Sequence, residues 1–148
     1  MNAIASDQRW WRDLRDPWLF AALALGTSLR LTSLGHGLPH VYNPDEVSIL
    51  SRALSLASGD WNPHNFLYPS LYFYILAAVT GALAVVAMVV GQAHSLAQFE
   101  AQFWQDPAMV YLAGRSLSAT AGVITIFAVY RLALRVGDHT LARVAAAL

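Results

Sequence analysis

The chain has 148 residues, of which 57% are hydrophobic and 12% are charged, and its formal net charge is zero. Soluble domains are about 45–50% apolar and about 25% charged, so this composition indicates an integral membrane protein, with no sign of nucleic-acid binding. Cysteine and lysine are absent, which excludes disulfides, thiolate metal sites, cysteine nucleophiles and lysine Schiff bases.

A polar tail, residues 1–16, which we expect to be cytoplasmic, precedes a first apolar segment, residues 17–35. As a helix this segment would measure roughly 27 Å, just enough to cross a bilayer. Arg30 lies near its end, where its head can reach the interface. A cleavable signal peptide is the alternative, but the tail is long and mixed in sign, and no A-x-A site follows. Three tryptophans suit the interface between membrane and water: Trp10, Trp11 and Trp18.

A helix over residues 44–58 is expected inside the following loop, residues 36–107. The sequence Asn-Pro-Asp-Glu at positions 43–46 supplies a capping side chain, a proline for the first helical position and two acids that complement the helix dipole. Gly59 suits the C-terminal end of this helix. The pattern therefore predicts a helix whose acidic first turn is fixed by its cap.

This helix is predicted to lie along the membrane surface, because its residues divide into two faces at helical spacing. The apolar face has Val47, Leu50, Leu54 and Ala57, and the polar face has Ser48, Arg52 and Ser55. Asp45 shares the polar face with Ser48 and Arg52. Two interpretations of the acid pair stay open: a helix cap in solvent, or a general base or ligand at the membrane surface.

The turn-rich stretch 59–69 alternates aromatic and polar residues, as at a membrane interface or a sugar-binding surface. His64 and Tyr68 are candidate substrate-binding residues here, although a single loop histidine is more often an ordinary one. His36 and His40 are four apart, but intervening Gly37 and Pro39 argue against a helical metal pair. No metal site is predicted, although the acid pair leaves a divalent cation open.

Two further long apolar segments follow, residues 70–91 and residues 108–131, and the second contains Arg115. After a short turn, residues 132–140, residues 141–148 read as the start of another transmembrane helix, as if the chain were the front of a longer protein. Arginines concentrate at the two ends, which predicts that both ends are cytoplasmic and that an even number of segments crosses. One of the three segments is then expected not to cross, and hydropathy alone would exclude the first, which is the weakest.

A series of short motifs resembles the N-terminal part of a GT-C-fold membrane glycosyltransferase, close to the protein O-mannosyltransferases and the bacterial aminoarabinose transferases. The resemblance covers residues 17–148, and its order and spacing are more specific than any single motif. The motifs are Arg30-Leu31, Tyr42-Asn43-Pro44-Asp45-Glu46, Ala53-Leu54, Ser58-Gly59-Asp60-Trp61, Tyr68-Pro69-Ser70-Leu71-Tyr72, Gly114-Arg115-Ser116-Leu117-Ser118-Ala119 and Tyr130-Arg131-Leu132-Ala133.

The resemblance implies an all-α, polytopic protein of the inner or plasma membrane. Such enzymes move a sugar from a polyprenyl-phosphate carrier to a protein, lipid or glycan acceptor at the outer face. Asp45 would then be the catalytic base, Glu46 its helper, and Arg115 a contact for the carrier phosphate, for which a guanidinium is well shaped. The family also has an apolar helix in its outer loop that begins at a step like Tyr68-Pro69, so residues 70–91 would pack from outside without crossing.

Two departures weaken this comparison. Several relatives have a lysine at the start of the loop helix, where this chain has residues 69–72 without a cation, so phosphate contact falls to Arg115, Arg52 or residues beyond 148. The family's second acidic residue lies after the next transmembrane helix, so the 148 residues are expected to be catalytically incomplete.

Two other functions stay open. Asp45, Glu46 and Arg115 could form an intramembrane relay in a transporter or proton-pathway subunit. Alternatively, the chain could be a small membrane scaffold without chemistry. The order of the motifs favours the transferase.

Overall fold

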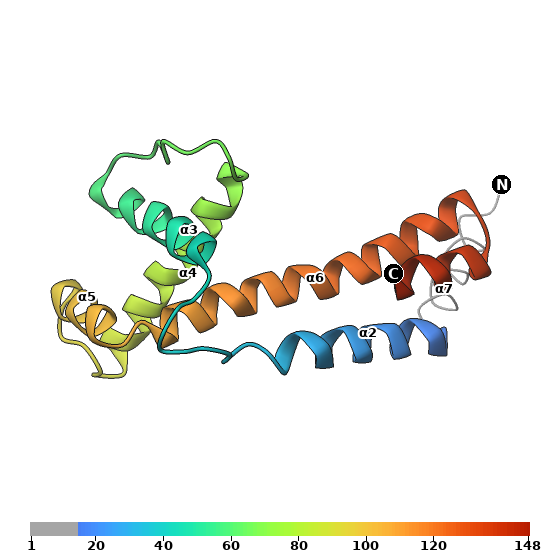
Figure 1. Ribbon diagram of the computed structural model, residues 1–148, viewed down its shortest axis with the longest axis horizontal. Coiled ribbons are helices and arrows are strands. Elements are labelled where there is room, and N and C mark those ends of the chain that lie inside the picture. The colour runs from blue at the N-terminus through green and yellow to red at the C-terminus, as the bar shows by residue number, and fades with distance from the viewer. Residues whose placement is uncertain (1–14) are drawn as a thin grey trace. The chain divides into compact units, whose positions relative to one another are not determined.

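The computed structural model describes residues 15–148, and the predicted all-α class is confirmed for this part of the chain, which contains helices and no strands (Figure 1). The tail with Trp10 and Trp11 lies outside the described residues. The helices are α2 (Pro17–Leu31), α3 (Pro44–Ser55), the 3₁₀ helix η1 (Leu56–Ser58), α4 (Ser70–Val89), α5 (Leu96–Gln105), α6 (Ala108–Val136) and α7 (His139–Ala147).

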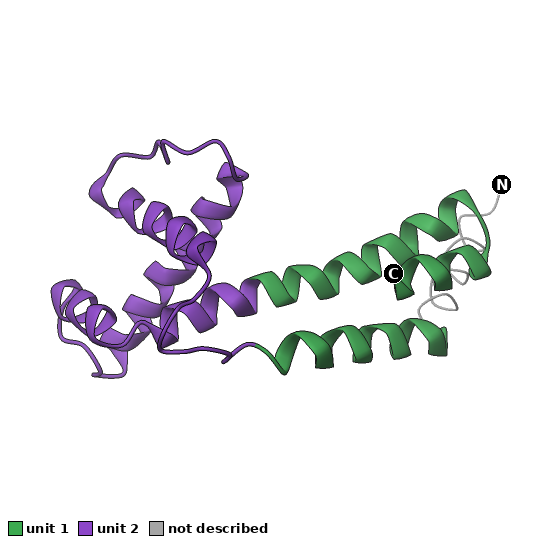
Figure 2. Ribbon diagram, in the orientation of Figure 1, with its two compact units in different colours: residues 1–33, 118–148 green, residues 34–117 purple. Residues whose placement is uncertain are grey.

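The chain forms two compact units (Figure 2). Unit 1 combines the described residues up to Ser33 with residues 118–148, and unit 2 consists of residues 34–117. The division falls within α6, so the first third of this helix belongs to unit 2 and the remainder to unit 1.

Unit 1 contains α2, the later part of α6 and α7. Its core is small: Leu19, Tyr130, Ala133, Ala142 and Ala146 are buried together. Helix α2 ends at Leu31 rather than at residue 35, because the glycine-containing stretch that follows forms turns. Helix α6 continues to Val136, so the turn predicted at residues 132–140 is much shorter than expected.

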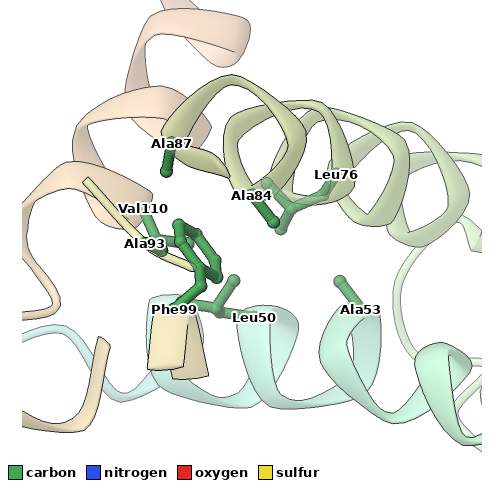
Figure 3. Packing of buried hydrophobic residues seen from close by; sticks show 8 residues of the cluster. All are labelled: Leu50, Ala53, Leu76, Ala84, Ala87, Ala93, Phe99 and Val110. Carbon is green, nitrogen blue, oxygen red and sulfur yellow. The ribbon is translucent and has the colours of Figure 1, made fainter. Parts of the chain in front are cut away.

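Unit 2 packs α3, α4 and α5 around a second core (Figure 3). Side chains from these helices and from the start of α6 point toward one another: Leu50, Ala53, Leu76, Ala84, Ala87, Ala93, Phe99 and Val110. Burying this apolar surface stabilises the unit by roughly 25 cal/mol for each Å² removed from water.

The predicted apolar face of α3 is partly wrong. Leu50 is buried as expected, but Val47 and Ala57 are exposed, and Ala53 and Leu56 are buried instead. The 3₁₀ turn η1 is the physical reason at the C-terminal end, because its tighter winding rotates successive side chains farther than an α-helix does. Gly59 then ends the helical stretch with a φ of 93°, as its glycine predicts.

Helix α5 is absent from the sequence-based assignment. Ser95 caps it by accepting a hydrogen bond from the Gln98 N–H at 3.1 Å. Phe99 and Phe103, four residues apart, give it an apolar face that packs on the unit 2 core. The capping serine and this spacing were the available signals.

Helices α4 and α6 are long and apolar enough to cross a membrane. Helix α2 has 15 residues and is shorter than a spanning helix. A spanning helix needs about 20 residues. Length therefore selects α4 and α6, whereas the resemblance selects the segments that start at residues 17 and 108. Either pair gives the even number of crossings that the arginine distribution predicts.

Candidate functional site

Arg115, on α6, is the centre of the most connected polar site in unit 2. Its Nε donates to Glu46 Oε1 at 3.1 Å, and its Nη2 donates to Glu46 Oε2 at 2.9 Å. Its Nη1 donates to the backbone carbonyls of Leu34 and His36, both at 2.7 Å. We call these four residues the Arg115 cluster. A guanidinium can donate five hydrogen bonds and does not lose its proton, so it suits this bridging position.

The start of α3 places the acid pair. The Asn43 side chain accepts a hydrogen bond from the Asp45 N–H at 3.0 Å, and Pro44 occupies the first helical position. The next residue, Glu46, turns toward Arg115, and its side chain is 28% exposed. Asp45, one residue earlier and about 100° around the helix, is exposed to solvent. In the first turn of the capped helix, one carboxylate is therefore in an ion pair and the other is accessible to solvent.

Tyr68 joins this site from the end of the loop before α4. The Asp45 carboxylate, as an acceptor for the Tyr68 hydroxyl, is the first cause that raises the pKa of the phenol above its usual 10.0, followed by desolvation and the negative charge of Asp45. Asp45, Glu46, Arg115 and Tyr68, all predicted site residues, are brought together in unit 2.

Helix α4 packs against α6 one residue away from Arg115. The Tyr72 hydroxyl donates to the Gly114 carbonyl at 3.4 Å. A Cβ at Gly114 would come within 3.3 Å of a Leu76 methyl group, so the missing side chain permits this close approach. The small residue beside Arg115 therefore allows α4 to approach this part of α6 closely.

His64 and Arg52, two predicted substrate-binding residues, are placed elsewhere. His64 Nε2 lies 2.7 Å from Asp60 Oδ2 in an exposed loop, and the pKa of Asp60 is lowered mainly by the Asn62 N–H and then by His64. The Arg52 side chain is exposed and makes no hydrogen bond or ion pair within residues 15–148. The structure gives neither residue a contact with Asp45 or Glu46.

No three histidine, aspartate or glutamate side chains gather as a metal site in the described part of the chain. Glu46 already shares both carboxylate oxygens with Arg115, so holding a cation with the acid pair would require that ion pair to open.

A second polar cluster, in unit 1, was not predicted from the sequence. The buried Asp16 carboxylate accepts hydrogen bonds from the Trp18 N–H at 3.0 Å, the Tyr130 hydroxyl at 2.8 Å and Arg143 Nε at 2.9 Å. We call Asp16, Tyr130 and Arg143 the Asp16 cluster. Burial raises the pKa of Asp16, but the bonds from Arg143, Tyr130 and Trp18 together outweigh it and lower the pKa below 3.8. The available signal was Asp16-Pro17, a capping residue before an N-terminal proline.

Arg30, also in unit 1, does not extend toward the end of α2 as expected. Its Nη1 donates to the Gly26 carbonyl, one turn back along the helix, at 3.0 Å. A Cβ at Gly122 of α6 would lie 2.4 Å from Arg30 Nε. The absence of a side chain at Gly122 therefore makes room for the Arg30 side chain.

Comparison with models of known protein families, with curated proteins and with solved structures finds no match to this chain.

Proposed function

We propose that this chain is a membrane glycosyltransferase, or the N-terminal portion of one, that moves a sugar from a polyprenyl-phosphate carrier to an acceptor at the outer face of the membrane. The observation that carries the proposal is the pairing of two differently placed carboxylates at the start of α3. Asp45 is exposed and oriented by Tyr68, while Glu46 is bound to Arg115. The order of the motifs listed above is independent support from the sequence.

Asp45 is the proposed general base. In the transfer, the acceptor hydroxyl oxygen bonds to the anomeric carbon of the sugar while the bond from that carbon to the carrier phosphate breaks. The hydroxyl proton passes to the Asp45 carboxylate, and the carrier leaves as polyprenyl phosphate. The Asp45 carboxylate is exposed, so its oxygens are accessible to the acceptor hydroxyl and can take that proton.

Arg115 is the proposed contact for the carrier phosphate. The Glu46 carboxylate presents two oxygens to its Nε and Nη2 atoms, and a phosphate presents the same two-oxygen geometry. Binding of the carrier would replace Glu46 on the guanidinium and leave that carboxylate beside Asp45. The two backbone carbonyls on Nη1 would keep the arginine in place during this exchange.

Transfer of labelled sugar from a prenyl-phosphate donor by the full-length protein tests the proposal. Asp45→Asn should reduce transfer by about 10²-fold or more, since general-base catalysis typically contributes about 10²–10⁴-fold. Glu100→Gln, at an exposed carboxylate of α5, is the matched control and should leave transfer unchanged. Full activity of Asp45→Asn would exclude the base assignment, and absence of transfer by the native protein would exclude the activity for that donor.

We further propose that both chain ends are cytoplasmic, that α2 and α6 cross, and that unit 2 is exposed outside. The chain lacks cysteine, so a single cysteine reports its own location. At Ala101, which is exposed on α5, it should react from outside with an impermeant thiol reagent in intact cells. Protection until the cells are opened would contradict this arrangement.

A further inference from the structure

The loop between η1 and α4 exposes an unusual concentration of large apolar side chains. Trp61 is 70% exposed, Phe66 is 79% exposed and Leu67 is 82% exposed. Isolated exposed apolar residues are ordinary, but several on one short loop mark an interaction surface. We call Trp61, Phe66 and Leu67 the loop surface.

Side-chain hydrogen bonds hold the backbone of this loop. Asp60 accepts from the Asn62 N–H at 2.9 Å, Asn62 from the His64 N–H at 3.0 Å, and Asn65 from the Leu67 N–H at 3.0 Å. These short-range bonds give the backbone turns that do not depend on burial of the apolar side chains. The loop surface is therefore presented outward by a fixed backbone.

The loop surface leads into α4, whose first turns also expose apolar side chains. The Tyr74 hydroxyl donates to the Trp61 carbonyl at 2.8 Å, which ties the loop to the second turn of the helix. Leu71 is 68% exposed and Ile75 is 39% exposed in the same turns. Helix α4 contains no charged residue and is one of the two described helices long and apolar enough to cross a membrane. Only 28% of its most apolar 18-residue stretch is buried inside the protein.

We infer that residues 60–68 form an interfacial anchor whose occupant is the phospholipid bilayer, with Trp61, Phe66 and Leu67 inserted at the level of the headgroups. In the proposed arrangement α4 does not cross, and a charge-free helix with so much uncovered apolar surface fits against the outer surface of the bilayer. The loop leads into the start of that helix. Tryptophan and other aromatic side chains concentrate at the membrane interface because their rings are apolar while their edges can hydrogen-bond. The Asn and His side chains between them suit the hydrated headgroup layer.

The inference does not depend on glycosyl transfer, so it is tested without an activity assay. A nitroxide is attached to a single cysteine in the complete chain, reconstituted into nanodiscs of phosphatidylcholine and phosphatidylglycerol. The test position is Phe66→Cys, whose exposed side chain has little packing to lose. The matched control is Ser55→Cys, an exposed position on the polar side of α3 in the same unit. Collision rates with oxygen, which enters lipid, and with a water-soluble nickel chelate are then compared.

At position 66 the ratio of oxygen to nickel collision rates should be several-fold higher than at position 55. Equal ratios at the two positions would place the loop in water and overturn the inference. Low collision rates with both reagents at position 66 would mean that protein, such as a second copy of the chain, covers the loop surface, and would overturn it equally. Circular dichroism of both labelled variants confirms that the helices are retained.

Discussion

Each of the two units contains an ion pair, but the central group is an acceptor in one unit and a donor in the other. In unit 1 the carboxylate of Asp16 is the centre, and three donors converge on it. In unit 2 the guanidinium of Arg115 is the centre, and acceptors from Glu46, Leu34 and His36 converge on it.

The difference in burial separates a structural pair from a displaceable one. The Asp16 side chain is 3% exposed, whereas that of Glu46 is 28% exposed. A buried carboxylate that loses a donor has no water to replace it, so the Asp16 cluster must remain intact for stability. Glu46 is partly hydrated and can leave Arg115 at smaller cost, which a site that exchanges ligands requires.

The largest effect should come from Asp16→Ala. The substitution removes the cap of α2 and the buried carboxylate to which the Tyr130 hydroxyl and Arg143 both donate, so the free energy of unfolding should fall by about 2–3 kcal/mol. Asp138→Ala is the matched control, because Asp138 also caps a helix, accepting from the Leu141 N–H, but joins no buried cluster. Its cost should be about 1 kcal/mol. Thermal unfolding in detergent measures both, and equal losses would remove the special role of Asp16.

Arg115→Ala should have the next largest effect. It leaves the Glu46 carboxylate and two backbone carbonyls without their donor, at a cost of about 2 kcal/mol after allowance for partial hydration. Arg52→Ala removes an exposed arginine that makes no bond within the described residues and should change stability by less than about 0.5 kcal/mol. Hydrogen exchange should locate the loss in the first turn of α3. Similar exchange in both variants would contradict the assigned hydrogen bonds.

A smaller effect is the pH dependence of the stability that Asp16 contributes in unit 1. The pKa of Asp16 in the folded chain lies below 3.8, so its ionised form contributes stability above about pH 3.8. As the pH falls below that value the unfolded chain binds the proton first, and the contribution is lost as the pH passes through the folded pKa. The stability difference between the native chain and Asp16→Asn should therefore shrink below about pH 3.8. Asp60, with its own lowered pKa, is common to both chains and cancels. A difference independent of pH would rule out this linkage.

The smallest effect concerns Tyr68. Its phenol pKa is raised first by the hydrogen bond to Asp45, so Asp45→Ala should move that pKa back toward 10.0. The absorbance of tyrosinate at about 295 nm follows the loss of phenol protons. One phenol of the native chain should lose its proton at a higher pH than in the variant. When both chains also carry Tyr68→Phe, the titrations with and without Asp45→Ala should coincide, which identifies Tyr68 as the shifted phenol. Identical titrations would mean that Asp45 and Tyr68 are not bonded.

Local chemistry predicted the start of α3 well. Asn43, Pro44 and Gly59 act through bonds and backbone angles within a few residues, and the helix begins and ends where they indicate. The same approach misplaced the end of α2 and missed α5, whose ten residues give a weak periodic signal. It also treated Ala57 as part of the α-helical face, because it did not anticipate a 3₁₀ turn.

By itself, the sequence determined the helical class, the capped acidic start of α3 and the candidacy of Asp45, Glu46, Arg115 and Tyr68. Only the tertiary structure decided which partners these side chains take. Glu46 and Arg115 are 69 residues apart, and Asp16 and Arg143 are 127 residues apart. Capping and periodicity act over a few residues, whereas such pairs depend on how packed helices bring distant side chains together. That is why Arg115 could be selected as a charge within an apolar helix, but not as the residue that binds Glu46 and the turn after α2.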